Sequence, residues 1–251
     1  MYDGVVTWNP IAGKCSHGCG YCYMNAMRRR WNNPKWEGCA RLDPNAFRAR
    51  FKTGSRVFVQ SISDLFSDDV PAPLIFDVLE FVERVAIDRD ITFIFQSRNV
   101  ERMEYFAEEW LFPVGAVAGT TIETNRYGLF QGPFDPDTRS HFLRRVGDCK
   151  DSGVEDFIKT FVTIEPVMKF DLERMLWLIR CSGAKVVNIG ADSKRSGLEE
   201  PSMDELLDLI SGVREMGLEV NLKKNLKRIL GEDGVVADAR RTVVRKNGGK
   251  G

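Results

Sequence analysis

The chain has 251 residues, with 36 Lys or Arg against 36 Asp or Glu, so its formal net charge is zero at pH 7. Hydrophobic residues make up 43% and charged residues 29%, which excludes a wholly disordered or fibrous chain and allows a sizeable core. No apolar run approaches the roughly 18 residues of a membrane span, and residues 1–9 lack a signal-peptide pattern. We therefore expect a cytoplasmic protein whose six cysteines are metal or catalytic candidates, not disulfide partners.

Short apolar, β-branched runs alternate with amphipathic stretches along the chain. The runs predict strands at 5–8, 57–61, 92–96, 116–122, 160–164, 186–189 and 219–222. Between them, helical patterns cover 73–87, 172–179 after an N-cap at Asp171, and a segment that begins with a capping box at Ser202 and ends at Gly217. This alternation predicts parallel βα units, fewer than the eight of a full (βα)8 barrel.

The zero net charge hides an uneven distribution. Residues 24–56 carry +7 and residues 222–251 carry +6; since residues 1–23 balance, residues 57–221 carry −13. Two interpretations stay open: these segments are ordinary solvated faces, or they form a basic rim that meets a polyanion.

Three cysteines at the spacing C-x3-C-x2-C follow the first predicted strand, as Cys15, Cys19 and Cys22. Thiolates are soft ligands that suit iron–sulfur clusters or zinc. A structural zinc ion needs a fourth ligand at matched spacing, but His17 is poorly placed within the loop and Cys39 has no paired partner nearby. Three ligands to a four-iron cluster leave one iron open, as in catalytic metal sites. The motif therefore predicts a metal centre on these three cysteines.

With the aromatic Tyr21 before its third cysteine, this motif resembles the signature of the radical S-adenosylmethionine (SAM) enzymes. The resemblance implies an α/β fold with a partial (βα)6 TIM-like barrel, a [4Fe–4S] cluster on the three cysteines and SAM on the open iron. It also implies that an electron donor such as flavodoxin or ferredoxin drives reductive cleavage of SAM to a 5′-deoxyadenosyl radical. We accordingly predict a barrel over residues 1–230 and a basic C-terminal extension over residues 231–251.

Shorter matches resemble two families within this group. Those to spore photoproduct lyase, which repairs thymine lesions in DNA, are residues 19–24, Ser63-Asp64, Ser97-Arg98 and Thr121. Those to a bacteriophage-associated radical SAM family include residues 8–10, residues 61–66 and Glu165-Pro166.

The resemblance also implies roles for polar residues near strand ends. For SAM, it implies that Ser63 and Asp64 hold the amino group, that Arg98 pairs with the carboxylate, and that Thr121 and Glu123 bind the ribose hydroxyls. It also implies that the backbone of Tyr21 and the side chain of Asn188 contact the adenine, and that Glu165 is a further acceptor. By the same resemblance, Cys149 donates a hydrogen atom to a substrate radical. The alternatives are a helix N-cap for Asp64, an internal salt bridge for Glu165 and an inert surface thiol for Cys149.

These observations predict a radical SAM enzyme, an isomerase or lyase that modifies, isomerises or repairs a nucleobase, of thymine type, in DNA or as a nucleotide. The basic segments flank the gap of an open barrel, where residues 28–30 beside Trp31, together with Lys223 and Lys224, would meet phosphate. The alternative is a nucleic-acid-binding protein whose three cysteines hold a structural metal.

Overall fold

The computed structural model describes residues 4–86, 89–109, 112–149, 157–194 and 196–231. They form one curved sheet whose strands all run parallel. Its strands are β1 (Val5–Trp8), β4 (Arg56–Val59), β5 (Thr92–Gln96), β6 (Val117–Thr121), β7 (Lys159–Ile164), β8 (Val186–Ile189) and β9 (Glu219–Leu222), paired in that order. Because β1 and β9 are its edges, the described sheet is a partial barrel that stays open between the first and last strands.

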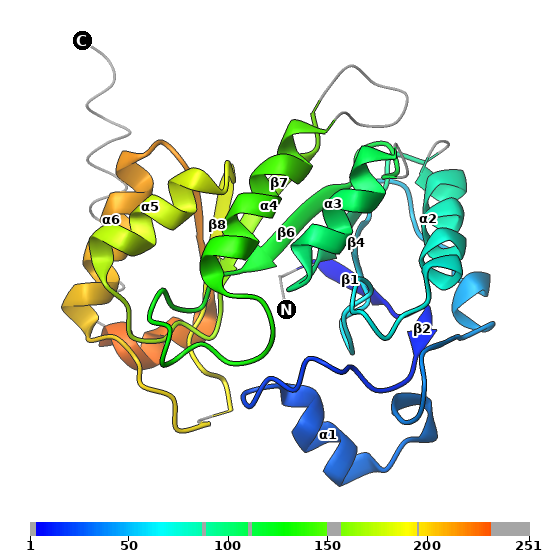
Figure 1. Cartoon of the computed structure of the whole chain (residues 1–251), viewed down its shortest axis with the longest axis horizontal. Coiled ribbons are helices and arrows are strands. Elements are labelled where there is room, and N and C mark those ends of the chain that lie inside the picture. The colour runs from blue at the N-terminus through cyan, green and yellow to red at the C-terminus, as the bar shows by residue number, and fades with distance from the viewer. Residues whose placement is uncertain (1–3, 87–88, 110–111, 150–156, 195, 232–251) are drawn as a thin grey trace.

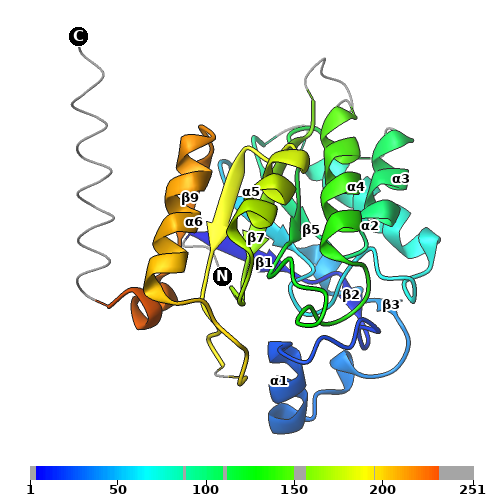
Figure 2. The ribbon, with the colours of Figure 1, turned by 60° about the vertical axis from the view of Figure 1, so that its left-hand side comes forward.

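Helices cover the outer face of this sheet, as Figures 1 and 2 show. They are α2 (Ala72–Ala86), α3 (Val100–Glu108), α4 (Pro136–Asp148), α5 (Leu172–Cys181) and α6 (Met203–Glu215). The helix α1 (Tyr23–Trp31) lies apart from them, below the carboxyl ends of the strands in Figure 1. The smaller elements are the antiparallel pair β2 (Ile11–Ala12) and β3 (Arg41–Leu42), and the 3-10 turns η1 (Pro34–Trp36), η2 (Ala46–Arg48) and η3 (Lys224–Leu226).

The core forms between the sheet and the apolar faces of these helices. In α2, Ile75, Val78 and Val82 are fully buried, at the helical spacing that the sequence shows. On the first strand Trp8 stacks on Phe81 of α2, with ring centroids 4.9 Å apart, which fixes the first βα unit. No helix among the described residues has both the length and the apolar character that crossing a membrane requires.

The seven predicted strands are all present, with ends that differ by at most two residues. The capping box at Ser202 and the left-handed Gly217 after α6 are confirmed. Asp171 precedes α5 as predicted, but its side chain makes no capping bond and accepts from Nη2 of Arg126 at 2.7 Å instead. Except for Gly231, the predicted C-terminal extension lies outside the described residues and stays a prediction.

Candidate functional site

A cavity of about 640 Å³ lies at the carboxyl ends of the strands. Polar residues that follow successive strands meet around it, from Ser61 after β4 to Lys223 after β9. Convergence on one place follows from the parallel sheet, because the carboxyl ends of parallel strands share one edge. The volume is typical of a site for a small molecule or cofactor.

The cysteine loop, residues 15–22, forms one wall of this cavity. Cys15, Cys19 and Cys22 all line it, each is partly buried, and none is in a disulfide. Cys22 is the N-cap residue of α1, and its backbone N–H donates to the carbonyl of Cys19 at 3.1 Å. The loop turns between the first two thiols at Gly18, whose φ of 66° is a conformation that a glycine adopts without steric penalty.

The thiols of this loop are suited to binding metal. Burial raises the pKa of Cys15 to about 11 and also raises that of Cys19, so both are protonated at neutral pH and a metal must displace their protons. Among the described residues, no three His, Cys, Asp or Glu side chains converge closely enough for a single ion. A four-iron cluster is a larger body than one ion and spreads its ligands more widely. Three thiols around one cavity therefore fit such a cluster as a donor set.

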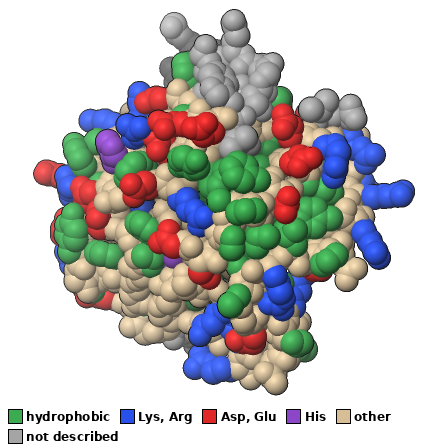
Figure 3. All heavy atoms as spheres, turned by 45° about the vertical axis from the view of Figure 1, so that its right-hand side comes forward, with side chains coloured by type: hydrophobic (Ala, Val, Ile, Leu, Met, Phe, Trp, Pro, Cys, Tyr) green, Lys and Arg blue, Asp and Glu red, His purple; other side chains and the backbone are tan. Residues whose placement is uncertain are grey.

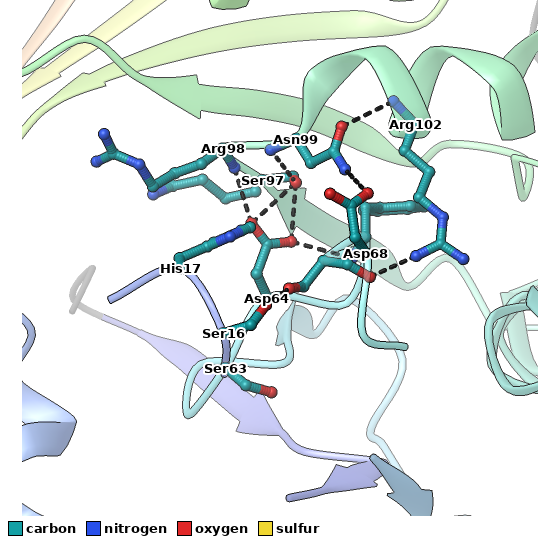
Figure 4. Close-up of polar contacts among 12 residues, drawn as sticks. Ser16, His17, Ser63, Asp64, Asp68, Ser97, Arg98, Asn99 and Arg102 are labelled. Atoms are coloured by element: carbon teal, nitrogen blue, oxygen red, sulfur yellow. Dashed lines mark hydrogen bonds and ion pairs between the residues drawn. The ribbon is translucent and has the colours of Figure 1, made fainter. Parts of the chain in front are cut away.

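Asp64 ties the cysteine loop to the ends of β4 and β5. Its carboxylate accepts hydrogen bonds at 2.8 Å from Nε2 of His17, Oγ of Ser97 and the backbone N–H of Arg98, as Figure 4 shows. The backbone N–H of Phe66 is a fourth donor, at 3.0 Å. Burial by itself would raise the pKa of Asp64, but the interactions with His17 and the hydrogen bonds from Arg98 and Ser97 together outweigh it and lower that pKa. The carboxylate is thus occupied by protein donors on both oxygens.

A second buried network, centred on Glu123, anchors the cysteine loop on the side away from the cavity. Glu123 is fully buried and accepts from Nη2 of Arg98 at 2.9 Å, from Nη1 of Arg139 at 2.8 Å and from the hydroxyl of Tyr21 at 3.1 Å. Burial by itself would raise the pKa of Glu123, but the charges of Arg139 and Arg98 outweigh it and lower that pKa. Nη1 of Arg98 also donates to the Tyr21 hydroxyl, so the loop is anchored through its aromatic residue.

The floor of the cavity carries hydroxyl groups that amide side chains hold in place. Nε2 of Gln96 donates to Oγ1 of Thr121 at 3.0 Å, and Oγ1 of Thr163 donates to Oε1 of Gln96 at 3.1 Å. Nε2 of Gln60 donates to Oγ of Ser63 at 2.6 Å. Ser63 and Thr121 therefore each accept one bond from the protein and keep their own proton for a ligand.

An ion pair lies on the side of the cavity formed by the last strands. Lys223 pairs with Oε2 of Glu165, and both residues line the cavity. Nδ2 of Asn225 donates to Oε1 of Glu165 at 3.3 Å. A Cβ on Gly190 would stand 2.7 Å from the Glu165 carboxylate, so this glycine leaves the space that the carboxylate fills. The salt bridge considered for Glu165 from the sequence is therefore present.

Basic side chains line part of the cavity and continue along the last turn of α1. Arg28 and Lys194 line the cavity, and Arg29 and Arg30 are exposed in the last turn of α1. Figure 3 shows Lys and Arg side chains on the lowest part of the molecule, where Figure 1 places α1. The guanidinium of Arg30 lies 5.2 Å from the ring centroid of the exposed Trp31.

Three residues predicted for the site do not reach the cavity. Glu123 is sealed behind it, so a ribose contact does not fit its position. Asn188 on β8 is outside the lining, and its Oδ1 accepts from Asn221 at 3.2 Å. Cys149 follows α4 near the start of β7, at the opposite end of the barrel from the cysteine loop, and its thiol donates to the carbonyl of Arg145 at 3.3 Å. We therefore do not assign Cys149 a hydrogen-donor role at this cavity.

The sequence analysis missed several residues of the site, among them Gly132 and Arg139. Gly132 has a φ of 90°, and a Cβ there would stand 3.0 Å from Sγ of Cys19. The Gly132-Pro133 pair signals a turn, but nothing in it indicates which loop the turn covers. Arg139 lies near the start of α4, where the helix dipole disfavours a cation, and this misfit was a signal that a carboxylate partner exists.

Comparisons with known proteins find one sequence family and several solved structures that resemble this chain. Residues 4–185 match a sequence family described as "Protein of unknown function (DUF5131)". No curated protein sequence matches the chain. Among solved structures, a spore photoproduct lyase mutant with dinucleoside spore photoproduct aligns with a TM-score of 0.60 at 12% identity, over 85% of this chain and 74% of that one.

Two further similar structures contain bound SAM, which is also abbreviated AdoMet. Spore photoproduct lyase with bound AdoMet and dinucleoside spore photoproduct aligns with a TM-score of 0.57 at 12% identity, over 86% of this chain and 75% of that one. Streptococcus suis SuiB bound to S-adenosylmethionine gives 0.50 at 11%, over 88% of this chain and 50% of that one. At this identity the likeness shows the fold: the chain has the α/β partial barrel of radical SAM enzymes.

Proposed function

We propose that this chain, which belongs to the DUF5131 family, is a radical SAM enzyme that acts on a nucleobase-containing substrate. One observation carries the proposal. Cys15, Cys19 and Cys22 face one cavity of about 640 Å³ at the carboxyl ends of parallel strands, in a fold shared with structures that bind SAM. In barrels of this kind chemistry takes place at that end of the strands.

The three cysteines are the ligands we propose for a [4Fe–4S] cluster, with SAM at the remaining iron. When bound, the cluster supplies the electron for reductive cleavage of SAM. The part of this chain is to hold the thiolates in place. Asp64 fixes the loop through His17, and the network around Glu123 fixes it through Tyr21.

The hydroxyls of Ser63 and Thr121 are the groups we propose for direct contact with SAM, at its amino group and its ribose. Each lines the cavity, and each keeps a proton and a lone pair after accepting from a glutamine. The backbone of Tyr21 is the proposed contact for adenine. Asp64 is occupied by protein donors on both oxygens and Arg98 by protein acceptors at both Nη atoms, which supports a positioning role for both.

A substrate that combines a nucleobase with phosphate is the class we propose. Five cationic side chains line the cavity, Lys14, Arg28, Arg98, Lys194 and Lys223, and a structure of similar fold is described with dinucleoside spore photoproduct. A thymine-type base in DNA or a nucleotide fits this chemistry. A one-electron donor such as flavodoxin or ferredoxin is the proposed partner.

The test of this function is anaerobic reconstitution followed by turnover. We expect a brown protein with about four irons and matching sulfide per chain. Reduced protein given SAM should release 5′-deoxyadenosine, and candidate nucleosides and nucleotides should then be screened for product. A colourless protein that retains one zinc ion and cleaves no SAM would favour the alternative, a nucleic-acid-binding protein with a structural metal.

Two adjacent lysines provide a matched test of the substrate site. Lys223 lines the cavity, whereas Lys224 lies outside its lining. Lys223→Gln should weaken binding of a thymidine nucleotide about tenfold, because it removes a cation and leaves the Glu165 carboxylate facing the phosphate, a change of about 1.4 kcal/mol. Lys224→Gln should change it less than about threefold.

Binding titrations at several salt concentrations measure both lysine variants. Affinity should fall as salt rises, and the slope should be smaller in Lys223→Gln. Equal effects of the two variants would remove Lys223 from the proposed phosphate site. If no nucleotide or nucleic acid binds at low salt, the substrate class is wrong and the SAM chemistry is left standing.

A further inference from the structure

Arg98 has a buried N–H group that the protein leaves without a partner. Its side chain is only 9% exposed. Nη1 donates to Tyr21, while Nη2 donates to Glu123 at 2.9 Å and to the carbonyl of Gln131 at 2.6 Å. Nε is buried and makes no hydrogen bond. An unsatisfied buried donor is unfavourable, so we expect a bound group to accept from it.

This free N–H lies next to Cys19. A Cβ placed on Gly132 would stand 3.0 Å from Sγ of Cys19 and 3.5 Å from Nε of Arg98, so both atoms border the same small space. Figure 4 shows the guanidinium pointing away from Asp64, which holds only the backbone of Arg98. The charges around Arg98 are also unbalanced, because two guanidinium groups, those of Arg98 and Arg139, pair with the single carboxylate of Glu123. One positive charge is therefore left without a counter-charge in these ion pairs.

We propose that Arg98 tunes the cluster: its Nε–H donates to the sulfur of Cys19, and its charge raises the reduction potential of the centre. This inference rests on the proposed function. One electron taken from the donor protein makes the cluster and its thiolates more negative. A cationic N–H beside a ligand sulfur stabilises that more negative state more than the oxidised one.

This role differs from the SAM carboxylate contact that the family resemblance implies for Arg98. A residue that only binds SAM makes no hydrogen bond to the cluster sulfur, so a variant that keeps its charge changes the potential only when SAM is present. A residue that donates to the Cys19 sulfur affects it in the absence of SAM as well. The potential of the SAM-free protein therefore separates the two roles.

The experiment is a redox titration of reconstituted protein without SAM, followed by visible absorbance and electron paramagnetic resonance. Arg98→Gln removes the charge and the Nε–H, and should shift the ratio of reduced to oxidised cluster about tenfold toward oxidised at a fixed ambient potential. For a one-electron couple this is a fall of about 59 mV. Arg98→Lys keeps the charge and should fall by less.

Arg102→Gln is the matched control, because the Arg102 guanidinium donates to the carbonyls of Ser67 and Val70 and not to the cysteine loop. Its potential should equal that of the wild type. Wild-type potential in Arg98→Gln with four irons retained overturns the proposal. If Arg98→Gln does not hold the cluster, Arg98→Lys decides, and wild-type potential there overturns it. A wild-type protein that binds no iron refutes the proposed function itself.

Discussion

Replacing Cys19 by alanine is expected to abolish both iron binding and SAM cleavage in the reconstituted protein. Cys19 is the middle of the three thiols that line the cavity, and Gly132 lies against its sulfur. Two remaining thiolates do not hold a four-iron cluster stably. Iron should fall from about four per chain to near zero, measured with sulfide content and 5′-deoxyadenosine release.

Two other cysteines serve as controls for this result. Cys39 is exposed, and Cys149 lies at the opposite end of the barrel. Cys39→Ala and Cys149→Ala should keep the iron content and the rate of SAM cleavage of the wild type. Normal cleavage in Cys19→Ala would overturn the cluster assignment, and loss of product formation in Cys149→Ala with SAM cleavage intact would contradict our removal of that residue from the site.

The sheet could be predicted from the sequence because its signals are local. Each of its strands is a short β-branched run followed by polar residues, and the helical pattern of α2 repeats at the spacing of its buried face. The helix α1 was not predicted, because its polar, arginine-rich sequence has only Met24 buried and so shows no apolar face. The helix begins after Cys22, and because the Cys22 side chain makes no capping hydrogen bond, no N-cap signal marks this start in the sequence.

The site was predictable only where its residues follow strands. Ser63, Thr121 and Lys223 lie at or just after strand ends in the sequence, which predicts that they meet at the carboxyl ends of the sheet, and all three line the cavity. Side-chain partners were not predictable, because Glu123 meets Arg98 and Arg139 through tertiary packing of β6, α3 and α4. The family resemblance suggested Arg98 and Glu123 as SAM contacts, but these ion pairs hold both side chains against the protein.

Glu123→Gln is expected to destabilise the fold by about 3–5 kcal/mol. The carboxylate is fully buried between two guanidinium groups, and the neutral amide would leave Arg98 and Arg139 buried without a counter-charge. The measurement is urea denaturation of the anaerobic protein, with the midpoint and the slope both compared with the wild type. Asp148→Asn is the control, because its pair with Arg144 is exposed and should contribute less than about 0.5 kcal/mol.

The same ion pair predicts a dependence on pH. The charges of the two arginines hold the pKa of Glu123 below its ordinary value despite burial, so its contribution to stability is fully present above about pH 4.3 and is lost as pH falls through the lower, folded-state pKa. The difference in free energy of unfolding between wild type and Glu123→Gln should therefore be constant near neutral pH and should narrow in acid. A difference that stays constant down to acid pH, or a neutral-pH loss no larger than that of Asp148→Asn, would contradict a charged Glu123 as the group that joins Arg98, Arg139 and the cysteine loop.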